Sequence, residues 1–286
     1  MEFIPGKNNN ALNTLPFAPE LITGAVMVNP HYPVNVLPPA EFWIDSGAFQ
    51  ERDMLARLQP WSALDRQLRM EAQIEYGGHD GYASHLVTYD MLAGVDEAIV
   101  DGRRVKRRGT EETAAGAVYE TIRSARYYQT QVGRIRGAIA YAAQGVTPAQ
   151  YLECVRALLP LMRPGRDCLA FGGFCIVGMV PSLKPILYET LDLVLPLLRE
   201  HGIMRAHLLG VTVADAIERA VAAERRYGVR LSTDSTGPER CAIFGRGYSN
   251  GRQVARYTKA EKYTVYHPAT FAIENIRDYN DWMKAL

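Results

Sequence analysis

Polar residues of the types that carry chemistry come directly after short apolar runs at five places in this chain. A carboxylate can act as a nucleophile or as a general acid and base, and an amide can bind the polar edge of a ligand. Any one of the acids, taken alone, is explained equally well as a helix cap or a turn residue. The combination is more than a plain core needs. The places are Asp45, Asp90, Gln144, the pair Gly172-Gly173, and Asp234.

The apolar runs alternate with helical patterns, which is typical of parallel β-α-β units. We expect strands at 21–28, 42–45, 85–89, 137–143, 168–172, 205–211, 229–234 and 241–244. We expect helices at 63–76, 111–132, 148–159, 184–201 and 213–227, starting at Thr147 and Thr212 and ending at Gly202 and Gly228. Eight strands predict a (β/α)8 TIM barrel, and a doubly wound open sheet is the alternative. In a barrel the five polar places would meet at the carboxyl ends of the strands.

The length of 286 residues and the hydrophobic content of 48% predict a single barrel domain that spans residues 1–286. Within it, we assign residues 1–20 to an N-terminal arm. We assign about residues 250–286 to a C-terminal extension that packs on the barrel.

The 32 Lys and Arg residues nearly balance the 31 Asp and Glu residues, so any nucleic-acid binding must come from local basic patches. The four cysteines show no paired spacing, which indicates reduced thiols rather than a disulfide framework or a zinc site. The first residues lack the pattern of a signal peptide, and no apolar run approaches the roughly 20 residues that span a bilayer. We therefore expect a cytoplasmic protein that needs no metal or other cofactor.

Six motifs, taken in order, resemble the tRNA-guanine transglycosylases (queuine tRNA-ribosyltransferases) and their DNA-modifying relatives, often called DpdA. The segment DSGAFQ at 45–50 is similar to the family's Asp-Ser-Gly-Gly-aromatic-Gln motif, and VTYD at 87–90 is similar to a strand that ends in an aromatic residue and Asp. AAQGV at 142–146, FGGF at 171–174 and HLLGV at 207–211 resemble three further strand ends, and STDST at 232–236 falls where the family has Phe-Asp-Cys-Val. The resemblance covers about residues 42–250 and implies a TIM-barrel pentosyltransferase.

The chain also departs from the family pattern. Ala48 stands where the family has a glycine, and Met91-Leu92-Ala93 replaces an Asp-Glu-Cys segment. The C-terminal Cys-x-Cys-x-x-Cys…His zinc site of the tRNA enzymes has no counterpart, so we expect no zinc subdomain. Because that site supports the region that handles tRNA, its absence favours the phage and bacterial DNA branch.

The resemblance implies the catalytic roles. Asp234 is the expected nucleophile, which attacks the anomeric carbon as the purine leaves. The hydroxyls of Ser232, Thr233, Ser235 and Thr236 are expected to hydrogen-bond it. Asp45 is the expected general acid and base.

The same resemblance implies a base-binding set. Asp90 would accept the N1–H and the amine of a guanine-like edge, while Gln144 and the Gly173 backbone N–H would donate to O6. Phe49 would stack on the purine and Leu209 would close its other face. For Phe49, Phe174 and Leu209, core packing is an equally good interpretation. The expected substrate-binding residues are Asp90, Gln144, Gly172, Gly173, Phe174, Phe49, Ser46 and Leu209.

A polymer substrate needs a basic groove, and two segments can supply one. The segment after Asp234 places four arginines among aromatic residues, where they can bind phosphates: Arg240, Arg246, Arg252 and Arg256. The segment GRRVKRRG at 102–109 is the other, although a solvated hairpin loop is the more common meaning of such a run. His207, in a strand pattern, is read as a core histidine.

The sequence hypothesis is therefore a transglycosylase that exchanges guanine in DNA for a 7-deazaguanine such as 7-cyano-7-deazaguanine (preQ0). One alternative is a tRNA-guanine transglycosylase. Others are a non-catalytic nucleic-acid-binding partner subunit and a barrel hydrolase that acts on small nucleosides. Relatives commonly pair as homodimers, so a homodimer is a further expectation.

Overall fold

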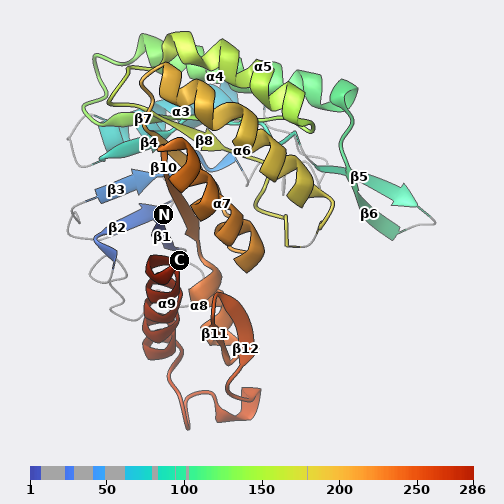
Figure 1. Ribbon diagram of the computed structural model, residues 1–286, viewed down its shortest axis with the longest axis vertical. Coiled ribbons are helices and arrows are strands. Elements are labelled where there is room, and N and C mark those ends of the chain that lie inside the picture. The colour runs from blue at the N-terminus through green and yellow to red at the C-terminus, as the bar shows by residue number, and fades with distance from the viewer. Residues whose placement is uncertain are drawn as a thin grey trace.

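Eight parallel strands close into a barrel in the computed structural model, which describes residues 1–7, 23–28, 41–48, 62–78, 83–93, 95–100, 103–178 and 180–286 (Figure 1). The order around the barrel is β1-β10-β9-β8-β7-β4-β3-β2, and every neighbouring pair for which the register is resolved is parallel. This confirms the predicted TIM barrel. The strands are β1 (Glu2–Lys7), β2 (Ala25–Val28), β3 (Glu41–Ile44), β4 (His85–Val87), β7 (Ala138–Ala143), β8 (Cys168–Phe171), β9 (Arg205–Leu208) and β10 (Arg230–Ser235).

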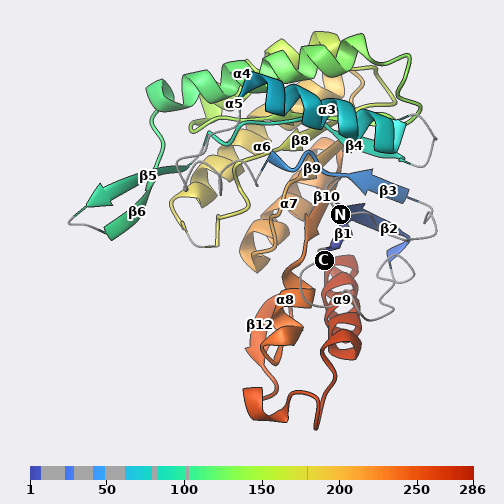
Figure 2. The same cartoon turned by 180° about the vertical axis from the view of Figure 1, so that it is seen from behind.

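Helices cover the outside of the barrel, and two hairpins extend beyond it (Figures 1 and 2). Hairpin β5–β6 (Val95–Val100 and Arg103–Arg108) follows β4 and projects away from the barrel in both views, while hairpin β11–β12 (Arg246–Ser249 and Arg252–Ala255) follows β10. No helix in the described ranges is both long enough and apolar enough to cross a membrane. The helices are α3 (Ala63–Gly78), α4 (Glu111–Thr130), α5 (Pro148–Leu158), α6 (Leu183–Glu200), α7 (Ala214–Tyr227), α8 (Gly237–Ile243) and α9 (Pro268–Ala285), with short 3-10 turns at Leu159–Leu161 and Lys259–Glu261.

The prediction of a strand at 241–244 was wrong. Most of that segment belongs to helix α8, in which Pro238 occupies the first turn and the buried residues Pro238, Cys241 and Ala242 follow the i, i+3, i+4 spacing of a helix. The missing barrel strand is β1, which we had placed in an N-terminal arm. It pairs with β10 on one side and β2 on the other, and its Phe3 and Ile4 are fully buried.

The helix boundaries mostly follow their local signals. Thr147 caps α5 by accepting a hydrogen bond from the Gln150 N–H, as predicted. The helix start predicted at Thr212 was wrong by one residue, because the N-cap of α7 is Val213. The Val213 side chain forms no capping hydrogen bond. Gly228 ends α7 in the left-handed conformation, with φ of 68°.

The last helix, α9, lies beside β1, so that the two chain termini are close together (Figures 1 and 2). Tyr279 of α9 meets Phe3 of β1 edge to face, with 4.9 Å between the ring centroids. The C-terminal segment thereby covers the strand that closes the barrel.

The barrel interior combines one large side chain with several small ones. Trp43 fills the centre, and small residues on β7 and β8 leave the room that it needs: Ala140, Ala142, Cys168 and Ala170. His85 stacks on Trp43 with 3.9 Å between the ring centroids. Burial and the nearby Arg205 lower the pKa of His85 to about 4, so the stacked ring is neutral near pH 7.

This packing predicts that Trp43→Ala lowers the free energy of unfolding by about 3–5 kcal/mol, because the surrounding strands cannot collapse into the space left behind. Urea denaturation measures the loss. Phe244, which is 68% exposed, provides the matched control, and Phe244→Ala should change stability by less than about 0.5 kcal/mol. Equal losses in the two variants would contradict the assignment of Trp43 as the filler of the barrel.

Candidate active site

The carboxyl ends of the barrel strands bring the predicted polar residues together. Asp90, after β4, accepts hydrogen bonds from the Ser46 hydroxyl (3.2 Å) and from the Gln144 side-chain amide. Asp45, after β3, lies near enough to Asp90 and to Asp234 on β10 for both charges to raise its pKa. Three carboxyl groups from three strands therefore share one rim of the barrel.

Gln73 of α3 fixes the strand ends that carry two of these acids. Its side-chain amide nitrogen lies 3.0 Å from the Ile44 carbonyl, 3.1 Å from the Asp45 carbonyl and 2.9 Å from the Val87 carbonyl. The hydroxyl of Tyr128 donates to the other end of the same side chain. The buried amide thus holds β3 and β4 at their carboxyl ends, where unpaired carbonyls would be costly.

Asp45 has an unusual protonation equilibrium. Burial, followed by the neighbouring charges of Asp234 and Asp90, raises the pKa of the Asp45 carboxyl to about 7. The side chain still keeps part of its surface open to the rim. A carboxyl group that gains and loses a proton near neutral pH is suited to general acid and base catalysis.

Asp90 and Gln144 form a tight pair against a glycine backbone. Burial raises the pKa of Asp90. A Cβ atom on Gly172 would overlap the Gln144 amide nitrogen and come within 2.6 Å of an Asp90 oxygen, so only glycine fits there. Gly173 has φ of +80°, a backbone conformation that also favours glycine. Its N–H donates to no group in the described ranges and can bind a ligand.

Asp234 is held by two donors through a single oxygen. Its Oδ1 accepts hydrogen bonds from His207 Nε2 (3.0 Å) and from the Gly210 backbone N–H (2.8 Å). The other nitrogen of the fully buried His207 ring lies 2.8 Å from the Ser232 hydroxyl. Because an ionised carboxylate only accepts hydrogen bonds, His207 Nε2 carries a proton when Asp234 is charged. Oδ2 has no hydrogen-bond donor within the described part of the chain.

His207 is the site residue that the sequence interpretation missed. Contrary to the prediction, the hydroxyls beside Asp234 do not bond to it: Thr233 donates to the Leu208 and Val211 carbonyls, and Ser235 accepts from the Gly237 N–H. Ser232 reaches Asp234 only through His207. Ser232 and His207 are paired across neighbouring strands, and strand alternation places residues 232 and 234 on one face. The alternation was visible in the sequence, whereas the pairing of Ser232 with His207 was not.

The remaining base-binding candidates differ in position. Ser46 is buried at the rim against Asp90, and Leu209 packs partly buried on the barrel interior. Phe174 is buried and stacks on Tyr151 at 4.9 Å, so its side chain belongs to the core. Phe49 lies outside the described residues.

The four arginines after Asp234 do not form one equivalent set. Arg240 on α8, Arg246 on β11 and Arg252 on β12 are exposed and form no ion pair with a described residue. Arg256 is bound to Asp278 at 2.7 Å and also donates to the Tyr248 carbonyl, so it supports the hairpin. The other predicted basic segment forms β6.

The fold and the rim define a closed parallel α/β barrel that carries a partly buried cluster of carboxyl groups at the carboxyl ends of its strands. Across the described ranges, no three His, Cys, Asp or Glu side chains converge as ligands of one metal ion. No protein-family model matches the chain, and no curated protein matches it.

The raised pKa of Asp45 predicts a pH-dependent stability. Between the ordinary value of 3.8 and about 7, the folded protein binds a proton that the unfolded chain has lost, so stability decreases as the pH rises through this window. Asp45→Asn removes this term. The free energy of unfolding of the variant, relative to that of the wild type, should therefore be about 2–3 kcal/mol higher at pH 8 than at pH 5.

Urea denaturation at the two pH values measures this difference. Asp281→Asn, an exposed change on α9, should follow the wild-type profile. Parallel pH profiles for the wild type and Asp45→Asn would refute the assignment of the buried proton to Asp45.

Proposed function

We propose that this protein is a transglycosylase that exchanges guanine in DNA for a 7-deazaguanine base through a covalent glycosyl-Asp234 intermediate. The observation that carries the proposal is the pairing of two unlike carboxyl groups at one rim. One oxygen of Asp234 is fixed by two donors, the other receives no hydrogen bond from a described residue, and the nearby Asp45 has a pKa of about 7.

The first half of the exchange breaks the glycosidic bond. Asp234 Oδ2 attacks the anomeric carbon as its bond to the purine nitrogen breaks, and protonated Asp45 gives its proton to the departing guanine. The second half reverses these roles. Asp45 removes the N9 proton of the incoming base, N9 attacks the anomeric carbon, and Asp234 is released.

His207 has a positioning role in this scheme. Its proton on Nε2 and the Gly210 N–H hold Oδ1, so the side chain cannot rotate away from the sugar. The contact between His207 and Trp43, 4.8 Å between ring centroids, fixes the imidazole in turn. A nucleophile held in place avoids the entropic cost of orienting it during the reaction.

The Asp90–Gln144 pair suits a guanine-like edge. A carboxylate has about four acceptor sites, and Asp90 accepts from Ser46, Gln144 and its own backbone N–H, which leaves acceptor capacity for a donor of the base. Gln144 has a second amide proton for O6, and the Gly173 N–H supplies another donor. The spare donors and acceptors thus match the polar edge of guanine and of its 7-deaza analogues.

A polymer substrate is supported by the positive charge on both sides of the rim. The β5–β6 hairpin follows the Asp90 strand and carries Arg103, Arg104, Lys106, Arg107 and Arg108 in sequence, and exposed arginines follow the Asp234 strand. Phosphates bind such cations through a salt-dependent electrostatic attraction. We propose DNA before tRNA because these 286 residues resemble the DNA-modifying branch more than the zinc-binding tRNA enzymes.

Nucleoside mass spectrometry on DNA and tRNA, from cells that express the protein and receive 7-cyano-7-deazaguanine, tests the proposal. We expect the modified deoxynucleoside in DNA, and we expect Asp234→Asn to abolish it because the amide is a poor nucleophile. Asp281→Asn should leave the yield unchanged. Modified ribonucleoside in tRNA alone would indicate the tRNA enzyme, and no product in either pool would favour a binding subunit.

The base-binding pair can be tested apart from turnover. Gly172→Ala forces Gln144 and Asp90 apart, so the affinity for free 7-deazaguanine should fall at least about tenfold when two charge-assisted hydrogen bonds are lost. Isothermal titration measures the dissociation constant. Gly116→Ala on α4, where a Cβ meets nothing within 4 Å, is the matched control and should bind normally. Unchanged affinity in Gly172→Ala would show that the base binds elsewhere.

A further inference from the structure

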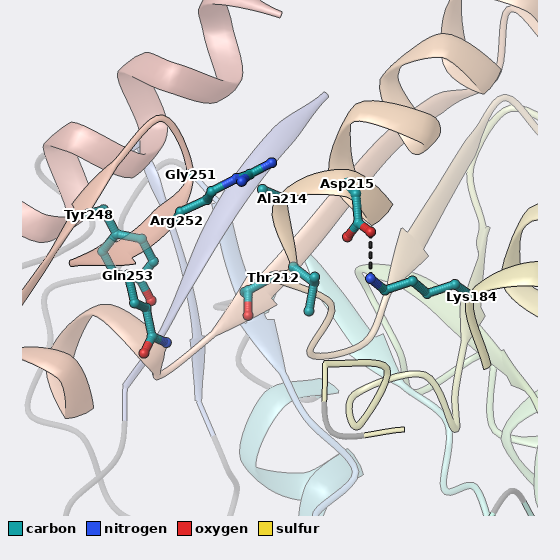
Figure 3. A pocket seen from close by; sticks show the side chains of 9 residues that line it. Lys184, Thr212, Ala214, Asp215, Tyr248, Gly251, Arg252 and Gln253 are labelled. Atoms are coloured by element: carbon teal, nitrogen blue, oxygen red, sulfur yellow. Dashed lines mark hydrogen bonds and ion pairs between the residues drawn. The ribbon is translucent and has the colours of Figure 1, made fainter. Parts of the chain in front are cut away.

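A cavity of about 450 Å³ lies between hairpin β11–β12 and the starts of α6 and α7 (Figure 3). It is open to solvent and is lined by charged, amide and hydroxyl groups as well as small side chains. Its size falls within the range of about 300–1,000 Å³ that small-ligand sites occupy. The polar residues on its wall are Lys184, Thr212, Asp215, Tyr248, Arg252 and Gln253.

The cavity and the proposed nucleophile share one loop. Gly210 donates its N–H to Asp234, and Thr212 on the cavity wall is two residues further along. Since consecutive Cα atoms are 3.8 Å apart, the Cα atoms of Gly210 and Thr212 are separated by no more than about 7.6 Å. One short loop therefore contacts the proposed nucleophile and also forms part of the cavity wall.

The charges on the cavity wall leave one cation available. Lys184 and Asp215 form an ion pair with each other, so their charges cancel (Figure 3). Arg252 extends from β12 toward the start of α7 and forms no ion pair with a described residue. The wall therefore carries a net positive charge that is placed on the guanidinium of Arg252.

The position of Arg252 is built into the hairpin. Asn250 and Gly251 form a two-residue turn in which both φ angles are positive, 49° and 69°, as in type I′ hairpins. A Cβ atom on Gly251 would overlap the ring of Trp282 on α9, so the glycine lets the turn pack directly on that ring. Arg252 follows directly, so the packed turn fixes the backbone position from which its side chain extends.

We propose that this cavity is a subsite for a backbone phosphate next to the target nucleotide, bound by Arg252. The proposal rests on the proposed function, because it places the polymer relative to Asp234. Thr212 and Gln253 add neutral hydrogen-bonding groups around the phosphate. Arginine is suited to this task, since its planar fork can donate two parallel hydrogen bonds to phosphate oxygens.

Fluorescence anisotropy with a labelled single-stranded oligodeoxynucleotide, at several salt concentrations, tests the subsite without requiring turnover. Arg252→Gln should weaken binding at least about tenfold, because the charge-assisted hydrogen bonds of the guanidinium are lost. It should also reduce the slope of log affinity against log salt by about one. The matched control is Arg226→Gln, an exposed arginine in the last turn of α7 and far from its start, which should retain the wild-type slope.

A titration with inorganic phosphate separates polymer recognition from simple anion binding. At a ligand concentration at which the oligonucleotide saturates the wild-type protein, inorganic phosphate should bind that protein only weakly. The subsite is refuted if Arg252→Gln keeps the wild-type affinity and slope, if the wild type binds no polynucleotide, or if phosphate alone shows the Arg252 dependence.

Base exchange measured in parallel separates this inference from the proposed function. Exchange by the wild type together with an unchanged slope in Arg252→Gln would refute the subsite alone. A reduced slope without any exchange would support the subsite and refute the transglycosylase.

Discussion

The site depends on the cost of burying carboxyl groups close together at one rim of a closed barrel, where burial and neighbouring charge both raise the pKa of Asp45. Water cannot fully solvate Asp45, Asp90 and Asp234 there, and like charges in a low-dielectric region cannot all remain ionised at low cost. The structure distributes the cost unequally. Asp234 receives donors from His207 and Gly210, Asp90 receives them from Ser46 and Gln144, and Asp45 keeps a proton until the pH approaches 7. This inequality creates one group suited to attack and another suited to move a proton.

The geometry of the rim also depends on contacts inside the barrel. His207 holds Asp234 only because its ring is fixed between Ser232 and Trp43, and Trp43 fits only because its neighbours on β7 and β8 are small. The Trp43 indole N–H in turn donates to Glu41, which pairs with Arg205 at the opposite end of the barrel. Core packing and site geometry therefore belong to one connected set of contacts, and a substitution of Trp43 would also alter the position of Asp234.

The surroundings of the rim set the kind of substrate that can approach. The acids at the centre attract no phosphate, so in the proposed function the nucleic acid is held from the sides of the rim. The basic residues for this role lie in the segments that follow β4 and β10. The β5–β6 hairpin extends from one side, and the exposed arginines of α8, β11 and β12 lie after β10 on the other. Hairpin β11–β12 is supported by Trp282 and by the Arg256–Asp278 ion pair, which suits it to the proposed role of holding a backbone phosphate.

The sequence by itself determined the alternation of strands and helices, the helix cap at Thr147 and the polar strand ends at Asp45, Asp90 and Gln144. Each of these is written in a local pattern: an apolar run, a capping residue or a change from apolar to polar. Only the tertiary structure decided that β1 closes the barrel. Its Pro5-Gly6 pair is more typical of a turn than of a strand, and its partner β10 lies more than 200 residues away in the sequence. It also decided that 241–244 is helical and that His207 bonds to Asp234. Short apolar runs fit either periodicity, and a buried histidine finds its partner through strand register, which no local pattern contains.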